Sequence, residues 1–387
     1  MSYCLNPRCP KPQNTNDERF CLTCGSKLLL KERYRAIKPI GQGGFGRTFL
    51  AVDEDKPSKP HCVIKQFYPQ AQGTSTVQKA VELFNQEAMR LDELGEHPQI
   101  PDLLAYFTQE DRQYLVQEFI DGYNLAQELL QSGTFSETQI RHLLYDLLPV
   151  LQFCHAHYVI HRDIKPENII RRRGIPGRST AIAQGNPGNL VLVDFGASKV
   201  ATNENLNKTG TSIGSPEYVA PEQIRGKALF ASDIYSLGVT CIHLLTGKSP
   251  FDLHDIHNDT WIWRQFLVSP LNQELAAILD SMLQTIPARR YQTVDEVLQD
   301  LNQWQPGHQP GNKPGKKTIN PAPITNNNQP RNSSQIDTEL NEIKTMFLSG
   351  GKSANISNNS NSSNPTPSQS KIDEELEEMR SKFLGNN

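Results

Sequence analysis

The sequence predicts an α+β fold with two lobes, in which a small β-rich lobe with one helix precedes a larger helical lobe. Between residues 34 and 120, most apolar residues fall in short runs rich in β-branched and aromatic types, which is typical of strands. Beyond residue 121 they recur mainly at helical spacing. Composition sets the limits of this region, because residues 1–30 are rich in cysteine and the chain after residue 304 is rich in Pro, Gly, Asn and Ser.

Bulk properties exclude several classes of protein. The chain has 387 residues, of which 36% are hydrophobic, so it is long enough for a large core with extensions. Its formal net charge of −3 gives no reason to expect a nucleic-acid or anionic-membrane partner. No run of about eighteen apolar residues occurs, and the N-terminus lacks the basic and apolar regions of a signal peptide. We therefore expect a soluble, cytoplasmic protein.

The head of the chain, residues 1–30, contains a cluster of cysteines. Two pairs, separated by eleven residues, are formed by Cys4, Cys9, Cys21 and Cys24. Four thiolates suit a tetrahedral structural zinc site, and such a short segment has almost no core of its own, so metal binding would supply its folding energy. A zinc-ribbon-like head is the favoured interpretation; a redox-switchable pair and an unstructured segment are the alternatives. The remaining cysteines, expected in the core, are Cys62, Cys154 and Cys241.

The β-rich lobe begins with a strand, a glycine loop and a second strand over 34–52, followed by a strand at 62–67, a helix at 77–94 and strands near 103–107 and 114–119. The loop fits G-x-G-x-x-G with Gly41, Gly43 and Gly46. Dinucleotide-binding folds share this motif, but there the glycines open a helix. Here a strand-like segment follows, which indicates a hairpin whose backbone can cover phosphates.

Lys65 lies in the strand after the hairpin, where its ammonium group would meet those phosphates. An unpaired buried lysine is costly, so a carboxylate partner is expected. Glu87, on the 77–94 helix, fits best, and Glu82 and Glu93 are rivals on the same helix.

The helical lobe carries the most specific segment of the chain, His161 to Asn168. Asp194-Phe195-Gly196 follows an apolar strand-like run at 190–193. Together with the glycine loop and Lys65 in this order, the sequence resembles the eukaryotic-like (Hanks-type) serine/threonine protein kinases of bacteria over about 34–301. The chain as a whole is similar to cyanobacterial kinases that carry an N-terminal four-cysteine motif. The resemblance implies a bilobal protein-kinase fold, with an N-lobe at 34–120 and a C-lobe at 121–301.

The resemblance also implies a reaction, the transfer of the γ-phosphate of ATP to serine and threonine hydroxyls of proteins, in a signalling role. Asp163 would be the base, Lys165 would steady the γ-phosphate, and Asn168 and Asp194 would hold Mg²⁺ or Mn²⁺. The string Lys-Pro-Glu-Asn after residue 164 resembles serine/threonine rather than tyrosine kinases. The implied ATP-binding residues are Gly41, Gly43, Phe45, Gly46, Thr48, Val63, Lys65, Glu87, Glu118 and Ile120.

The segment 194–222 resembles an activation segment. Its candidate phosphorylation sites are Thr209, Thr211 and Ser212, and Arg162 beside the base would receive the phosphate. Ser215 stands where the family commonly has threonine, and it keeps the hydroxyl. The implied structural supports are an ion pair between Glu222 and Arg290 and a brace on the catalytic loop from Asp233.

The tail, residues 305–387, has the composition of a disordered segment. Within it, apolar residues at helical spacing occur in two copies, at about 334–349 and 370–384, which predicts two short amphipathic helices. We expect them to dock a partner or to self-associate; the alternative is that they pack back on the kinase domain.

Two other functions compete with a kinase. A pseudokinase scaffold predicts the loss of at least one catalytic residue, but all five are present: Lys65, Glu87, Asp163, Asn168 and Asp194. In a redox- or metal-sensing scaffold, the cysteine head would carry the function and the kinase region would be only accessory.

Overall fold

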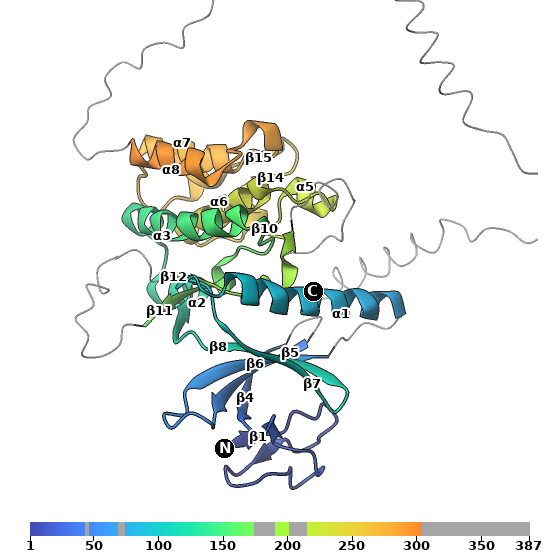
Figure 1. Ribbon diagram of the computed structural model, residues 1–387. Helices are drawn as coiled ribbons and strands as arrows, with labels where there is room; N and C mark the ends of the chain where they lie inside the picture. Colours follow the sequence, from blue (N-terminus) through green and yellow to red (C-terminus); the bar gives the residue numbers. More distant parts are fainter. Residues whose placement is uncertain (43–45, 69–73, 174–189, 201–214, 304–387) are drawn as a thin grey trace, which may run out of the picture. The chain divides into compact units, whose positions relative to one another are not determined.

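The protein is represented by a computed structural model that describes residues 1–42, 46–68, 74–173, 190–200 and 215–303 (Figure 1). Several predictions fall outside these residues. They concern Gly43, Phe45, the phosphorylation candidates Thr209, Thr211 and Ser212, and both tail helices.

The N-lobe is built on a six-stranded antiparallel sheet with the order β3-β4-β5-β6-β8-β7. Its strands are β3 (Leu29–Leu30), β4 (Tyr34–Gln42), β5 (Gly46–Asp53), β6 (His61–Phe67), β7 (Leu103–Gln109) and β8 (Arg112–Glu118). Helix α1 (Thr74–Leu94) lies between this sheet and the helical lobe (Figure 1). The predicted small β-rich lobe with one helix is confirmed for the described residues.

The two faces of the sheet have different roles, because successive side chains of a strand point to opposite sides. In β6, Val63, Lys65 and Phe67 share the face toward α1, where Phe67 packs against Phe84 of that helix. Ile64 and its neighbours on the other face belong to a separate apolar cluster. Lys65 and the apolar layer on the opposite face therefore alternate along one strand.

The C-lobe is mainly helical, as predicted. Its helices are α2 (Leu125–Ser132), α3 (Glu137–Ala156), α5 (Pro221–Ile224), α6 (Phe230–Thr246), α7 (Gln273–Met282) and α8 (Val294–Asn302). Helices α2 and α3 begin at capping boxes, in which Asn124 and Ser136 accept a hydrogen bond from the backbone of the third helical residue. Fifteen residues of α6 are buried, so this helix forms the centre of the lobe.

Short strands frame the loops between these helices. They are β9 (Gly122–Asn124), β10 (Val159–Ile160), β11 (Ile169–Arg172), β12 (Leu190–Leu192), β13 (Lys199–Val200), β14 (His254–Asp255) and β15 (Thr260–Trp261). The pairs β11–β12 and β10–β13 flank the segments 161–168 and 194–198 on both sides. As a result, the two motif-bearing loops are held side by side.

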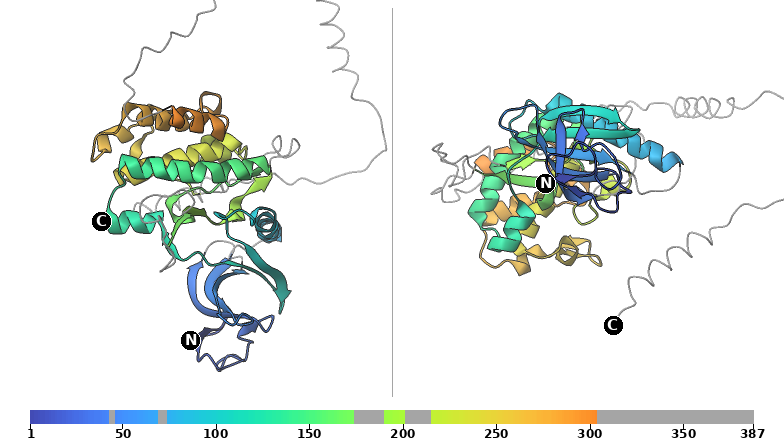
Figure 2. Two further views of the ribbon diagram at one scale, coloured as in Figure 1. Left: turned by 60° about the vertical axis from the view of Figure 1, so that its left-hand side comes forward. Right: turned by 90° about the horizontal axis from the view of Figure 1, so that it is seen from below.

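The head forms a two-stranded sheet of β1 (Ser2–Tyr3) and β2 (Gln13–Asn14) and then enters the N-lobe through β3. Figures 1 and 2 show it against the sheet on the side away from α1. The sequence suggested a segment with almost no core, but Leu5 is buried in the apolar cluster of the N-lobe with Tyr34 and Phe49. The head uses the core of the lobe because the sheet presents an apolar face to it.

Two further expectations concern the apolar parts of the chain. Cys62, Cys154 and Cys241 are fully buried, which confirms that they are core residues. Within the described residues, no helix combines the length and the apolar character that a membrane span requires.

Candidate active site

A cavity of about 860 Å³ lies between the two lobes and gathers most of the predicted site residues. The N-lobe contributes Gly41, Gly46, Thr48, Lys65 and Glu87 to its lining, and the C-lobe contributes Asp163, Lys165, Asn168, Asp194 and Ser215. Val63, Glu118 and Ile120 are not among the lining residues. Val63 and Ile120 are buried, and the carboxylate of Glu118 pairs with Arg172 at 2.9 Å.

Lys65 lines this cavity and contacts one carboxylate from each lobe. Its ammonium group contacts the carboxylate of Glu87 and lies 3.0 Å from Oδ1 of Asp194. Burial opposes the charge of Lys65, but Asp194 and Glu87 outweigh burial and raise its pKa above the ordinary value. In turn, the charge of Lys65 lowers the pKa of Asp194 to about 2, so this carboxylate is ionised at neutral pH.

Gly196 leaves room for Glu87 beside the 194–196 turn. A Cβ atom at Gly196 would lie 3.1 Å from Oε2 of Glu87, tighter than most real contacts. The rival Glu93 contacts Arg90 of its own helix. Helix α1 therefore presents Glu87 to the lysine.

Asp163 is held by donors on both carboxylate oxygens. The backbone N–H and the hydroxyl of Ser215 donate to Oδ1 at 2.9 and 3.0 Å, and Nδ2 of Asn168 donates to Oδ2 at 3.0 Å. Lys165 Nζ lies 2.9 Å from Oδ2 and donates to the Ser215 hydroxyl at 2.6 Å. This network fixes the direction in which the carboxylate faces the cavity.

Buried groups support the loop that carries Asp163. Asp233 of α6 accepts hydrogen bonds from the backbone N–H groups of His161 and Arg162, both at 2.9 Å. Arg290 pairs with Glu222 of α5 at 2.7 Å. Sequence reasoning missed Gln223, which donates to the carbonyl of Arg162 at 2.7 Å, because no spacing pattern marks it.

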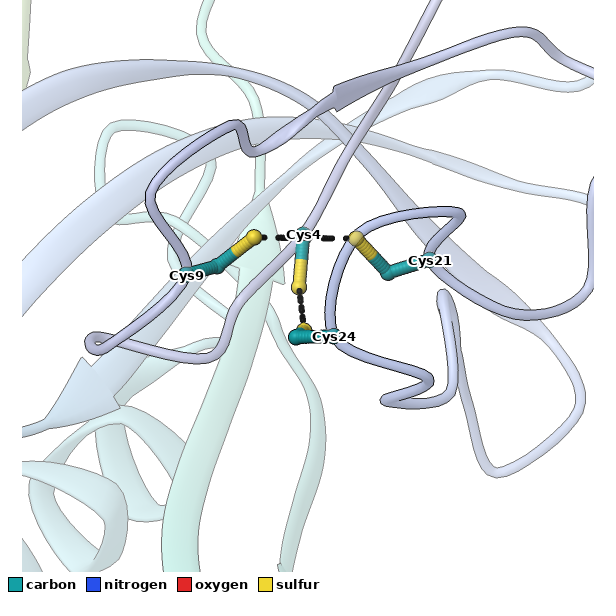
Figure 3. A group of neighbouring side chains, drawn as sticks. All are labelled: Cys4, Cys9, Cys21 and Cys24. Carbon is teal, nitrogen blue, oxygen red and sulfur yellow. Dashed lines mark hydrogen bonds between the residues drawn. The ribbon is translucent and has the colours of Figure 1, made fainter.

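The four head cysteines form a second site (Figure 3). Their Sγ atoms all lie within 4.8 Å of one another, and the Cys4–Cys24 and Cys9–Cys21 pairs are 3.6 Å apart. A disulfide requires about 2 Å, whereas zinc–sulfur bonds of about 2.3 Å in a tetrahedron place sulfurs about 3.8 Å apart. The spacing therefore fits a tetrahedral metal ion.

Donors around Cys21 and Cys24 favour thiolates at these two residues, whereas burial raises the pKa values of Cys4 and Cys9. The amides of Asn14 and Asn6 point at Cys21 and Cys24, each at 3.6 Å. Burial works against ionisation of Cys24, but hydrogen bonds from Ser26 and Asn6 outweigh it and lower the pKa to about 6. Such contacts commonly surround metal-bound sulfur.

A two-lobed fold with a lysine, an aspartate pair and an asparagine around one interlobe cavity is the arrangement typical of protein kinases. Residues 34–302 match the protein kinase domain, so the chain belongs to the protein kinase family, which confirms the family inferred from the sequence.

Several curated relatives are similar to this chain. It is 39% identical over 311 residues to serine/threonine-protein kinase B of Synechocystis sp., covering 78% of this chain and 52% of that protein. It is 43% identical over 282 residues to serine/threonine-protein kinase C of the same organism, covering 70% and 50%. To PknA of Nostoc sp. it is 40% identical over 280 residues, covering 70% and 47%. The chain thus spans about half the length of these relatives.

Proposed function

We propose that this protein is a serine/threonine protein kinase that transfers the γ-phosphoryl group of ATP to hydroxyl groups of protein substrates. The observation that carries the proposal is the meeting of Lys65, Asp163, Asn168 and Asp194 at one cavity. Its relatives named serine/threonine-protein kinases support the class of acceptor.

Asp163 has the role of base in this proposal. Because both of its oxygens already accept hydrogen bonds, the carboxylate is oriented before the substrate arrives. It would accept the proton of the attacking hydroxyl and align that oxygen with the phosphorus. Lys165, 2.9 Å from the same carboxylate, would balance the charge that moves onto the transferred group.

Lys65 and Asp194 form the proposed nucleotide-binding side of the cavity. Lys65 would bind the phosphates of ATP, with Glu87 holding its ammonium group in place. Magnesium, when bound, supplies positive charge that neutralises the phosphates. The residues fit this ion, because Asp194 provides an ionised carboxylate and the amide Nδ2 of Asn168 already donates to Asp163, which leaves its oxygen for a ligand role.

Radiolabel transfer from γ-labelled ATP tests the proposal. Wild-type protein should label protein substrates, whereas Asp163→Ala and Lys65→Ala should lose at least a hundredfold in rate. Lys248→Ala, at an exposed lysine of the C-lobe, is the matched control and should label like wild type. Equal labelling by all four proteins would favour the scaffold alternative and reject the enzyme.

We propose structural Zn²⁺ as the ligand of the cysteine head, and a cytoplasmic location that keeps the thiols reduced. All seven cysteines are free, and four have the spacing of a zinc site. Metal analysis of purified protein should give one zinc per chain, and none for Cys21→Ser. A zinc-free wild-type protein whose cysteines form disulfides on mild oxidation would favour the redox alternative.

Two further roles rest on the sequence alone. We propose that phosphorylation at Thr209, Thr211 or Ser212 activates the kinase through Arg162, and that the tail repeats at 334–349 and 370–384 dock a partner or self-associate. Phosphosite mapping of the active enzyme tests the first role. The second is wrong if a chain ending at Trp304 phosphorylates its native substrate as efficiently as the full chain and has the same oligomeric state.

A further inference from the structure

The N-lobe sheet has an apolar face on the side opposite the nucleotide cavity. This outer face includes the buried side chains of Phe49, Ala51, Cys62, Ile64, Tyr114 and Val116. An antiparallel sheet with one face in water would place polar residues there. The outer face therefore belongs to an interface, and within the described residues the cysteine head lies on that side (Figure 2).

The head docks on this face through several kinds of contact. Leu5 is buried in the same apolar cluster, and the ring of Tyr3 lies 5.7 Å from that of Phe49. Arg35 of β4 donates to the carbonyl of Glu18 at 2.8 Å. Leu5 comes directly after Cys4, so the residue that anchors the head is adjacent in sequence to a predicted metal ligand.

Gln66 is the polar group that joins the head to the nucleotide site. Its buried amide Nε2 donates to the carbonyl of Leu5 at 2.8 Å and contacts the hydroxyl of Tyr114 at 3.2 Å. It follows Lys65 in β6, with its side chain on the opposite face. Its backbone also touches the end of the glycine loop, because a Cβ atom at Gly46 would lie 2.4 Å from the carbonyl oxygen of Gln66.

We propose that Gln66 is a positioning residue through which metal binding at the cysteine head strengthens nucleotide binding. The ion holds Cys4, Cys4 places the Leu5 carbonyl, and that carbonyl holds the strand segment that carries Lys65 and faces Gly46. Without the ion, the Leu5 carbonyl leaves and the buried amide of Gln66 keeps only its contact with the Tyr114 hydroxyl, so β6 shifts or loosens. One net hydrogen bond corresponds to about a fivefold change in the nucleotide dissociation constant.

The inference rests on the proposed nucleotide site and the proposed zinc site. A binding experiment on the full chain tests the inference separately from these two sites. The dissociation constant of a fluorescent ADP analogue with Mg²⁺ is measured with zinc bound and after removal of zinc by a zinc-selective chelator. Zinc removal should raise the wild-type constant about fivefold. Gln66→Leu should show the raised constant with zinc bound and no further change after its removal, since the variant already lacks the link.

Tyr114→Phe is the matched control. It removes the other hydrogen-bond partner of Gln66 and leaves the head contact, so it should respond to zinc like wild type. An unchanged wild-type constant after zinc removal, or a wild-type response in Gln66→Leu, would overturn the inference while leaving the kinase proposal intact. Failure of the zinc-loaded wild type to bind the analogue would instead reject the nucleotide site.

Linkage gives a second test that needs no variant. If zinc strengthens nucleotide binding fivefold, saturating ADP must strengthen zinc binding by the same factor. A zinc dissociation constant that is equal with and without ADP would overturn the inference, even if Gln66→Leu does not fold.

Discussion

Replacing Arg290 with alanine should destabilise the C-lobe strongly. The side chain of Arg290 is 0% exposed and that of its partner Glu222 is 9% exposed. Arg290 also donates to the backbone carbonyls of Ala231 and Gln284 at 2.8 to 3.0 Å. Its removal leaves a buried carboxylate whose remaining described partner is the hydroxyl of Ser232, and the cost of a broken buried pair is about 3–5 kcal/mol.

Thermal unfolding, read by circular dichroism, measures this loss. For a domain of this size, about 2–4 °C of Tm accompany each kcal/mol, so Tm should fall by roughly 6–20 °C. Arg290→Met combined with Glu222→Leu should recover most of the loss, because no buried charge is then left unpaired. Arg264→Ala is the control, since its pair with Asp280 has both side chains 42% exposed and should contribute less than about 1 kcal/mol.

Two results would refute this reasoning. The first is a loss below about 1 kcal/mol for Arg290→Ala, which would mean that water reaches Glu222. The second is a double variant as unstable as Arg290→Ala, which would mean that lost packing, rather than an unpaired buried charge, causes the loss of stability.

Three further predictions follow from contacts in the structure. Ser215→Ala should lower kcat about 10- to 100-fold, because it removes a hydroxyl that donates a hydrogen bond to Asp163. Ser215→Thr keeps the hydroxyl and should stay within about threefold of wild type. Steady-state kinetics measure both variants, and equal rates for the two would contradict a role for this contact. Zinc removal should expose residues 1–30 to limited proteolysis, since the head keeps little core of its own, and an unchanged digestion pattern would contradict the metal's structural role. Gly122→Ala should lower Tm far more than Gly25→Ala. A Cβ at Gly122 would lie 1.9 Å from the Arg171 carbonyl oxygen, whereas a Cβ at Gly25 would meet no atom within 4 Å and only the φ of +71° would be strained. Equal changes in Tm would show that β9 and β11 separate freely to make room for the methyl group.

The sequence could predict the fold and the class of site because kinase chemistry depends on residues at fixed spacings. The glycine loop, Lys65 and the 161–168 segment each carry such spacing, and Glu87 is singled out by its place on the helix. The hydrogen bond between Ser215 and Asp163 could not be predicted from spacing, because the two residues are far apart along the chain.

The docking of the head could not be predicted. Tyr3 and Leu5 are single apolar residues in a cysteine-rich segment and form no periodic pattern. Gln66 is a polar residue in a strand, a type usually assigned to the solvent side, yet it is fully buried. Long-range contacts of this kind become visible only when the two faces of the sheet are distinguished in three dimensions.

The covered outer face has a practical consequence for anyone who expresses the catalytic region alone. The family match starts at residue 34, and a protein cut there would lose Tyr3 and Leu5 and leave the ring of Phe49 in contact with water. Uncovered apolar surface of this kind promotes self-association and precipitation. Low yield or poor ATP binding by the shortened protein would then result from the loss of the head from the outer face of the sheet. A soluble protein with an intact N-lobe therefore requires the first thirty residues.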